Sequence, residues 1–309
     1  MKKIVTSILL ATAVVSLGIC APKSKKSKKS KNKNYKVQLI TMDQMDQHWA
    51  NVDKGAKAAV AELGQVDYKW NAPSTKDDAQ QIECINNAVA QGADAILLAA
   101  NGPDAVTSAL RDATSAGVKI IYVDSAANYP GEITLSTDNK SAGKTAGQEM
   151  LNELKSKGIT SGSIGVISVN SATASTVARE EGFRSAFAGT KFTILETQYC
   201  DGDASRSKDA AANFITQGVI GLFGANEGST VGIGNAIRES NSKVVGVGFD
   251  TSDTIKQLIK QGYILCTMSQ NPYTMGYEGL KSAVKVLSGE KLPSKSVDTG
   301  VSVITKKDL

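Results

Sequence analysis

The chain has 309 residues, a length that suggests about two domains, and its 41% hydrophobic and 21% charged residues are typical of a globular protein. Its net charge of +5 is unevenly distributed: residues 1–36 contain ten lysines and no acidic residue, which leaves 25 basic against 30 acidic residues in 37–309. Such an acidic body is poorly suited to nucleic acid, because phosphate binding requires clustered lysines and arginines. A single histidine disfavours histidine-rich metal sites, so we expect no metal.

Residues 1–20 are typical of an export signal. Two lysines precede 16 uncharged, mostly apolar residues (4–19), a run shorter than the roughly 20 residues that a membrane span needs. Residues 17–20, LGIC, are similar to a bacterial lipobox, in which the cysteine becomes the lipidated first residue of the mature protein, although Ile19 replaces the usual small residue. We therefore expect Cys20 to carry a lipid that anchors the protein to the membrane, with plain signal cleavage nearby as the alternative.

Residues 21–36 are rich in lysine and contain almost nothing to bury, so we expect a disordered tether. Charge repulsion extends such a segment, which spans at most about 50 Å at roughly 3.3 Å per residue. The tether either only holds the body away from the membrane or also binds anionic lipid, at about 1 kcal/mol per lysine.

The three later cysteines show no paired spacing. Cys84 lies in a helix-like pattern and Cys266 in a strand-like one, so both are expected to be small buried apolar residues. With Cys200 they make an odd number, which leaves at least one free thiol.

From residue 37 onward the sequence alternates strand-like and helix-like segments. Continuous apolar runs such as DAILLAA (94–100) are typical of parallel strands that are covered on both faces. Strands are expected at 37–42, 66–71, 94–100, 118–123, 164–169, 192–199, 219–225, 244–249 and 264–269, and helices at 47–63, 77–91 and 103–116 among others. This alternation indicates βαβ units, and their number exceeds one core, so we predict an α/β fold with two similar lobes.

Polar and aromatic side chains follow several of the predicted strands. Ligands of parallel α/β sheets bind beyond the carboxyl ends of the strands. The side chains at these places are Asp46, His48 and Trp49, then Asp124 and Ser125, and finally Asn226, Asp250 and Gln270. Carboxylates and amides bind hydroxyl groups, and aromatic rings stack on the C–H faces of sugars. Any one of these residues could be a helix N-cap, but five such places in register favour a site for a hydroxylated ligand.

In this order and spacing, the sequence resembles the type I periplasmic solute-binding proteins of the ribose and galactose sugar-binding type, which serve ABC importers. The resemblance covers 37–309 and rests on GADAILLAANGPDAV (92–106), VDSAANYPGEITLSTDN (123–139), AREEGFRSAF (178–187), LFGANEGSTVGIGNAI (222–237), VVGVGFD (244–250), CTMSQNP (266–272) and KVLSGEKLP (285–293). It implies two Rossmann-like lobes with parallel sheets, joined by a three-crossing hinge. The crossings would fall near 137–138, near Gln270 and near 297–298, dividing the body into 37–137 plus 271–297 and 138–270 plus 298–309.

The resemblance also implies a sugar site. Asp46 corresponds to an acidic or amide residue that binds hydroxyls, His48 and Trp49 to the aromatic pair flanking the ring, and Asp124, Asn226, Asp250 and Gln270 to further polar contacts. Arg179 falls where galactose-type members place an arginine, whereas ribose-type members place it two residues earlier, at Val177. Ser125 replaces an arginine common in ribose binders, and Gly202 stands where an aromatic residue is often found. The sequence therefore does not single out ribose.

Three neighbouring residues have mainly structural interpretations. Trp70, at the end of the second strand, is expected to pack in the core. Glu227 is interpreted as a charge at a helix start rather than a ligand contact. Phe249 either packs behind Asp250 or borders the pocket.

These features favour a binding protein over other classes. The sequence contains no G-x-S-x-G, no G-x-x-x-x-G-K-[ST], no H-E-x-x-H and no dinucleotide fingerprint, so we expect neither an enzyme nor a cofactor. A sugar-responsive repressor would carry a helix-turn-helix where this chain has its export signal. The expected role is binding a monosaccharide or polyol in the periplasm, or lipid-anchored at the outer face of the cytoplasmic membrane, and delivering it to ABC importer permease subunits. The alternative is a sensory protein that presents its bound form to a chemoreceptor or sensor kinase.

Overall fold

The computed structural model describes residues 34–309, so the predicted signal, Cys20 and most of the predicted tether lie outside the described residues. The tether prediction ends two residues too late, because strand β1 (Tyr35–Ile40) begins at Tyr35. The Tyr35 hydroxyl donates to the carbonyl of Leu287 at 3.3 Å, and the Lys36 amide donates to Asp94 at 2.9 Å. Within residues 34–309, no helix has both the length and the apolar character needed to cross a membrane.

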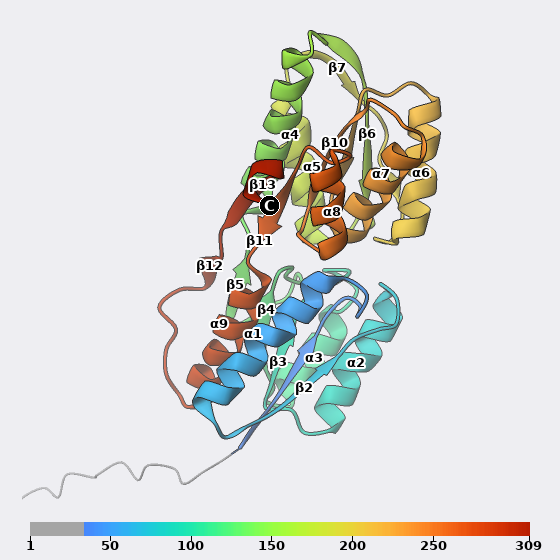
Figure 1. Cartoon of the computed structure of the whole chain (residues 1–309). Coiled ribbons are helices and arrows are strands. Elements are labelled where there is room, and N and C mark those ends of the chain that lie inside the picture. The colour runs from blue at the N-terminus through green and yellow to red at the C-terminus, as the bar shows by residue number, and fades with distance from the viewer. Residues whose placement is uncertain (1–33) are drawn as a thin grey trace, which may run out of the picture. The chain divides into compact units, whose positions relative to one another are not determined.

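The described residues form two α/β lobes, each built on its own sheet (Figure 1). The N-terminal lobe has an all-parallel sheet in the order β12-β5-β4-β3-β1-β2. Its further elements are α1 (Gln47–Leu63), β2 (Val66–Asn71), α2 (Asp78–Ala90), β3 (Ala95–Leu98), α3 (Thr107–Ser115), β4 (Lys119–Val123), β5 (Ile133–Ser136), α9 (Pro272–Leu287) and β12 (Ser296–Asp298).

Alternating side chains of the central strands build two cores in this lobe. In β3, Ala95 and Leu97 pack toward α1 and α9, whereas Ile96 and Leu98 pack toward α2 and α3. All four are fully buried, as the continuous apolar run predicted for a strand with helices on both faces. Trp70 packs against the core on the α1 side, which confirms its predicted structural role, and its Nε1 donates to Thr41 Oγ1 at 2.9 Å.

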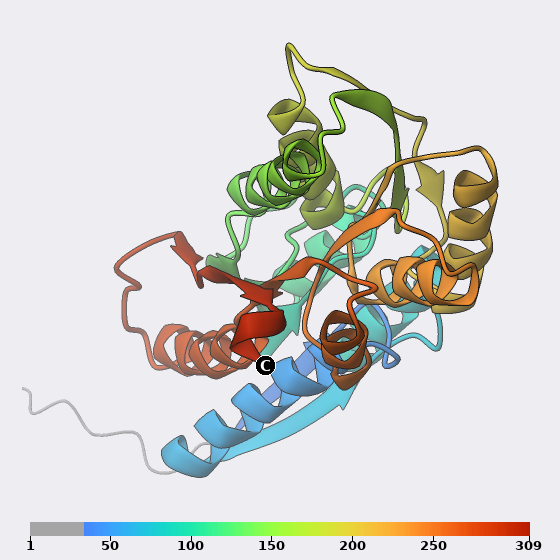
Figure 2. The same cartoon turned by 45° about the horizontal axis from the view of Figure 1, so that its top comes forward.

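The C-terminal lobe repeats this plan. Figure 2 shows α4 and the group α6–α8 on opposite sides of its sheet, in agreement with its two core clusters. The elements are α4 (Asn139–Ser156), β6 (Ser161–Ser168), α5 (Ala174–Ala186), β7 (Lys191–Ile194), β8 (Gln198–Tyr199), α6 (Ala204–Thr216), β9 (Gly221–Gly224), α7 (Glu227–Glu239), β10 (Val245–Phe249), α8 (Asp253–Gln261), β11 (Cys266–Gln270), β13 (Val301–Thr305) and the 3-10 turn η1 (Lys306–Asp308). Cys84, Cys200 and Cys266 are free thiols.

One strand departs from the predicted parallel arrangement. The sheet runs β13-β11-β10-β9-β6-β7, with β8 also paired to β6, and β13 lies antiparallel to β11. The reason is the chain path: β13 enters directly from β12 of the other lobe after only Thr299 and Gly300, without a crossover helix.

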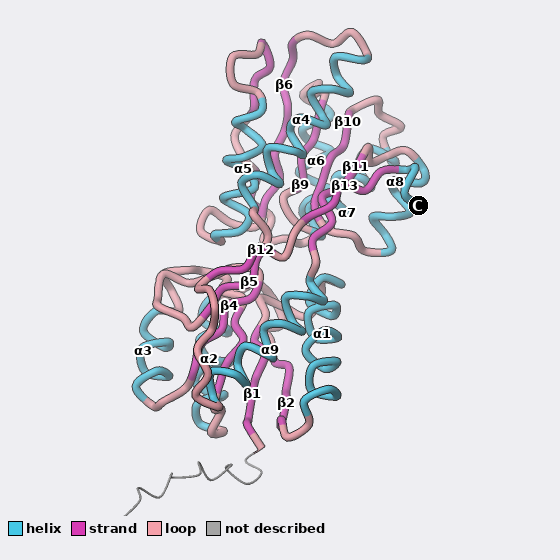
Figure 3. Tube along the Cα trace, turned by 90° about the vertical axis from the view of Figure 1, so that its left-hand side faces the viewer, coloured by secondary structure: helices cyan, strands magenta, loops and turns pink. Residues whose placement is uncertain are grey.

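The chain passes between the lobes three times, after β5, after β11 and after β12 (Figure 3). Side chains tie the three crossings together. Thr137 Oγ1 donates to Gln270 Oε1 at 2.9 Å, and the amides of Asp138 and Gly300 donate to one oxygen of Asp298 at 3.2 and 2.9 Å. The two-lobed fold with a three-crossing hinge is therefore present.

Candidate ligand-binding site

The ends of β4 and β10 place one carboxylate from each lobe at the cleft. Asp124 follows β4 and Asp250 follows β10, and both are 5% exposed. Both have left-handed backbone conformations, with φ of 62° and 71°. Such conformations are uncommon outside glycine and concentrate at functional sites, and here they turn each carboxylate away from the strand direction and into the cleft.

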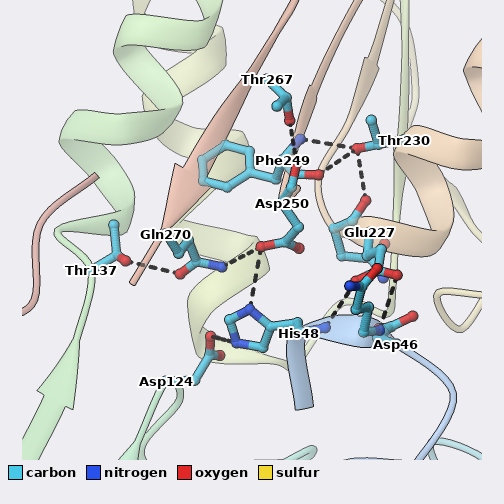
Figure 4. Close-up of polar contacts among 12 residues, drawn as sticks. Asp46, His48, Asp124, Thr137, Glu227, Thr230, Phe249, Asp250, Thr267 and Gln270 are labelled. Carbon is cyan, nitrogen blue, oxygen red and sulfur yellow. Dashed lines mark hydrogen bonds and ion pairs between the residues drawn. The ribbon is translucent and has the colours of Figure 1, made fainter. Parts of the chain in front are cut away.

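His48, on the first turn of α1, lies between these two carboxylates (Figure 4). Its Nε2 is 3.0 Å from Asp124 Oδ2 and its Nδ1 is 3.5 Å from Asp250 Oδ1. Burial opposes the charged imidazolium, but the bond to Asp124 and the charges of both carboxylates outweigh it and raise the pKa of His48 to about 9. At neutral pH the imidazolium therefore joins the lobes electrostatically.

Arg179, on α5, is held by backbone and side-chain acceptors of its own lobe. Its Nε donates to Asn139 Oδ1 at 2.8 Å and its Nη1 to the carbonyl of Ala225 at 3.0 Å, while its guanidinium lies 4.4 Å from the centre of the Phe249 ring. Nη2 reaches to 3.7 Å from Asp124 across the cleft. Phe249 thus packs beneath Arg179 in the core, which settles the alternative left open for it.

Close packing of α4 against α5 fixes the position of Arg179. A side chain at Gly143 would place its Cβ 2.0 Å from the carbonyl oxygen of Arg179, and one at Gly182 would lie 2.0 Å from the carbonyl of Lys140. Only glycine allows the two backbones to approach this closely, so these residues set how far Arg179 reaches into the cleft.

A lysine that the sequence analysis did not single out also enters the site. Lys76, in the loop after β2, forms ion pairs with Asp43 and, at 3.1 Å, with Asp46. Burial opposes its charge, yet the two carboxylates raise the pKa of Lys76 above its usual value; burial also raises the pKa of Asp46, with Lys76 opposing that shift. Gly202 makes room for the lysine, since a Cβ there would lie 3.0 Å from Lys76 Nζ.

Eight of the nine predicted ligand residues line one cavity: Asp46, His48, Trp49, Asp124, Arg179, Asn226, Asp250 and Gln270. Ser125 is buried but does not line this cavity, so the structure does not bring it into the site. The cavity measures about 20 Å³, which is room for about one water molecule. A monosaccharide can therefore enter only if the lobes part and side chains around the cavity rearrange.

Apart from His48 Nε2, which is ion-paired with Asp124, three buried donors around the cavity have no hydrogen-bond partner among residues 34–309: Trp49 Nε1, Arg179 Nη2 and Asn226 Nδ2. Acceptor oxygens line the same cavity as these donors, on the carboxylates of Asp124 and Asp250. One of these oxygens, Asp250 Oδ1, already accepts a hydrogen bond from Gln270 Nε2 at 2.7 Å. A hydroxyl group both donates and accepts, so a ligand rich in hydroxyls can serve the carboxylates and the free donors together.

Glu227 has a larger role than the sequence predicted. It does begin α7, as expected, but its carboxylate also crosses the cleft: Oε1 accepts from the amide of Gln47 and Oε2 from the amide of His48, both at 3.0 Å. Nothing in the local sequence pattern could reveal this contact, because its partners lie about 180 residues earlier in the chain.

Two lobes on sheets that are parallel except for β13, three hinge crossings and a buried polar cavity between the lobes define the architecture of a periplasmic binding protein. The chain matches the periplasmic binding protein domain family over residues 37–291 and belongs to that family.

Its relatives include proteins that bind sugars. The ribose import binding protein RbsB of Haemophilus influenzae is 29% identical over 247 residues, covering 78% of this chain and 82% of its own. Among solved structures, an ABC transporter solute-binding protein from Agrobacterium vitis with bound D-fucose is 31% identical, with a TM-score of 0.84 and coverage of 88% of this chain and 96% of its own. A carbohydrate transporter solute-binding protein from Agrobacterium radiobacter, in complex with D-arabinose, is 29% identical with a TM-score of 0.85 and coverage of 89% and 95%.

Proposed function

We propose that this protein binds a monosaccharide or similar polyol outside the cytoplasm and delivers it to the permease of an ABC importer. The observation that carries the proposal is the buried cavity, to which both lobes contribute carboxylates and unpaired donors suited to hydroxyl groups. The relatives named for ribose, D-fucose and D-arabinose support the same ligand class. In this role the site binds and releases its ligand unchanged.

The mechanism we propose is closure of two bodies, 37–137 plus 271–297 and 138–270 plus 298–309, about the hinge. Asp124 lies on the first and Asp250 on the second, so a ligand that binds both carboxylates has more contacts when the lobes are closed. Only this difference in affinity can shift the protein toward the closed form. A permease, or a chemoreceptor or sensor kinase, could then recognise the closed surface.

A thermal-shift and calorimetric screen of the full chain tests the ligand class. D-ribose, D-arabinose and D-fucose form the first panel, with glycine and leucine as controls of unrelated chemistry. A specific sugar at 100 times its Kd should stabilise the fold by about 2.7 kcal/mol. If no sugar or polyol raises the melting temperature at millimolar concentration, the proposal fails. Loss of uptake of the same sugar in cells lacking the protein would test the importer role.

The finer part of the proposal concerns location. We propose that Cys20 is lipidated and holds the protein at the outer face of the cytoplasmic membrane or in the periplasm. Cys20→Ser should then move the exported protein from the membrane fraction to the soluble fraction. Unchanged membrane association of this variant would exclude the anchor.

A further inference from the structure

Helix α1 receives its N-terminal cap from the opposite lobe. Asp46 occupies the N-cap position, but its side chain makes no capping hydrogen bond. The first two free amides, of Gln47 and His48, instead donate to the two carboxylate oxygens of Glu227, at 3.0 Å each. Since unpaired amides at a helix start need an acceptor, α1 is fully capped from within the protein only while the lobes are closed.

A second contact runs in the reverse direction. The side chain of Gln47, from the N-terminal lobe, accepts through Oε1 from the amide of Asp253 at 3.0 Å, and Asp253 is the first residue of α8 in the C-terminal lobe. Each lobe therefore supplies an acceptor to the start of a helix in the other. We call this pair of contacts, made by Glu227 and Gln47, the capping clasp.

We propose that the capping clasp sets how tightly the lobes close on the sugar, with Glu227 as a positioning residue whose effect depends on its protonation. This inference rests on the proposed function. Glu227 is 8% exposed and does not line the 20 Å³ cavity. It lines two larger cavities, of about 350 and 770 Å³. It acts through α1, which carries His48 and Trp49 into the site.

The charges of Asp46 and Asp250 act directly on Glu227. The two cavities that Glu227 lines also contain other titratable or charged side chains: His48 and Lys256 in the first, and Lys76, Arg206, Asp43, Asp77, Asp201 and Asp203 in the second. Lys76 is paired with Asp43 and Asp46, Arg206 with Asp201, and Lys256 with Asp253. Burial first, and then the charges of Asp46 and Asp250, raise the pKa of Glu227 to about 7, against the effect of its two amide donors.

The sign of the pH effect follows from linkage. When the lobes part, water reaches Glu227 and Asp250 moves away, so the pKa of Glu227 falls toward the ordinary value of a glutamate, 4.5. Between pH 7 and pH 4.5 the closing of the lobes is therefore accompanied by uptake of a proton on Glu227. The closed form becomes more stable relative to the open form as the pH falls toward 4.5. Between pH 8 and pH 6 this difference corresponds to about a tenfold gain in sugar affinity.

The experiment measures affinity by calorimetry from pH 6 to pH 8, using whichever of D-ribose, D-arabinose or D-fucose binds most tightly. Glu227→Gln is neutral and keeps one acceptor oxygen, whereas Glu227→Ala and Gln47→Ala each remove one of the two contacts of the capping clasp. Glu239→Gln makes the same change at an exposed position of α7 and serves as the control. In parallel, small-angle scattering follows the radius of gyration of the sugar-free protein over the same pH range.

Wild-type protein and Glu239→Gln should bind about tenfold more tightly at pH 6 than at pH 8. Glu227→Gln should show a shallower pH dependence than the wild type, and the part that remains is due to His48, which also contacts carboxylates of both lobes. Glu227→Ala should bind about tenfold more weakly at pH 6, and Gln47→Ala should weaken binding about threefold while keeping the slope. If Glu227→Gln keeps the wild-type slope, Asp46 or His48 carries it and the proposal is overturned. Wild-type affinity in both alanine variants would overturn it too.

Failure of the sugar assignment gives a different result. If the wild-type protein binds none of the three sugars, the proposed function is in doubt, while the clasp is judged from scattering alone. Sugar-free wild-type protein should then become more compact from pH 8 to pH 6 and Glu227→Ala should not. An equal radius of gyration for both proteins at both pH values would reject the clasp.

Discussion

At the scale of single residues, Asp124 and Asp250 are counterparts: each follows a buried strand of its own lobe and each has a left-handed backbone. Asparagine tolerates this conformation as well as aspartate does, whereas alanine would add strain. Asp124→Asn and Asp250→Asn therefore keep the backbone conformation, remove the negative charge and replace one acceptor oxygen by an NH2 donor. Hydrogen bonds to charged groups contribute about 1.5–3 kcal/mol each, so we expect each variant to lose at least tenfold in sugar affinity.

Calorimetry measures this loss, and circular dichroism shows that the fold is retained. Asp112→Asn, at an exposed position of α3, is the matched control and should bind like the wild type. Near-wild-type affinity in both site variants would remove the two carboxylates from the ligand contacts.

His48 should make the stability of the sugar-free protein depend on pH. Its pKa of about 9 in the folded protein lies above the ordinary histidine value of 6.5, so its stabilising contribution is fully present below pH 6.5 and is lost as pH rises through about 9. The melting temperature should fall between pH 7 and pH 9.5 in the wild type and much less in His48→Gln. Since the chain has no other histidine, a wild-type decline of the same size in the variant would assign it to a different group.

Most residues that line the cavity could be predicted from the sequence because they follow strand ends, and parallel sheets bring those ends to one edge. Arg179, on α5, was expected from the family resemblance alone. The exceptions have physical causes. Lys76 lies five residues beyond the end of β2, in a loop rather than at the strand end, and its tip packs closely against Gly202 of the other lobe. Ser125 directly follows Asp124 but does not line the cavity.

At the scale of elements, the contact between α4 and α5 places Arg179. Gly143→Val would force the two helices apart, since a Cβ at that position meets the Arg179 carbonyl at 2.0 Å. We expect a stability loss of about 1–3 kcal/mol from overpacking, together with weaker sugar binding as Arg179 withdraws. Denaturant unfolding and calorimetry measure the two effects, and Lys144→Ala, at the next, exposed residue of α4, is the control. Intact affinity in Gly143→Val would show that Arg179 does not depend on this contact.

The elements that contain long apolar runs were predicted correctly, and the elements that were missed or misplaced are short or interrupted. The expected strand at 192–199 is broken into β7 and β8, and in the gap Arg184 donates to the carbonyl of Leu195 at 3.0 Å. The helix expected from residue 103 begins at Thr107, since the Pro103 carbonyl accepts from the Asn128 amide. The strands β5, β12 and β13 were missed because they lie outside the continuous apolar runs on which the strand prediction relied.

At the scale of the whole molecule, ligand binding should change compactness. A sugar that contacts Asp124 and Asp250 together favours the closed arrangement, so the radius of gyration in small-angle scattering should decrease when saturating sugar is added at pH 8, where the clasp is weakest. A radius of gyration that stays constant, with binding confirmed by calorimetry, would reject hinge closure. The full chain should be used, because a fragment starting at residue 37 would remove Tyr35 and Lys36 from β1.

The solitary histidine has a practical consequence. Its imidazole touches a carboxylate from each lobe, and the chain contains no second ring of this kind. In a proton magnetic resonance spectrum of untagged protein, the carbon-bound ring protons of His48 should thus give one uncrowded set of signals. The chemical shifts of these protons would report the protonation of His48, the opening of the cleft and the binding of sugar, without any label being introduced.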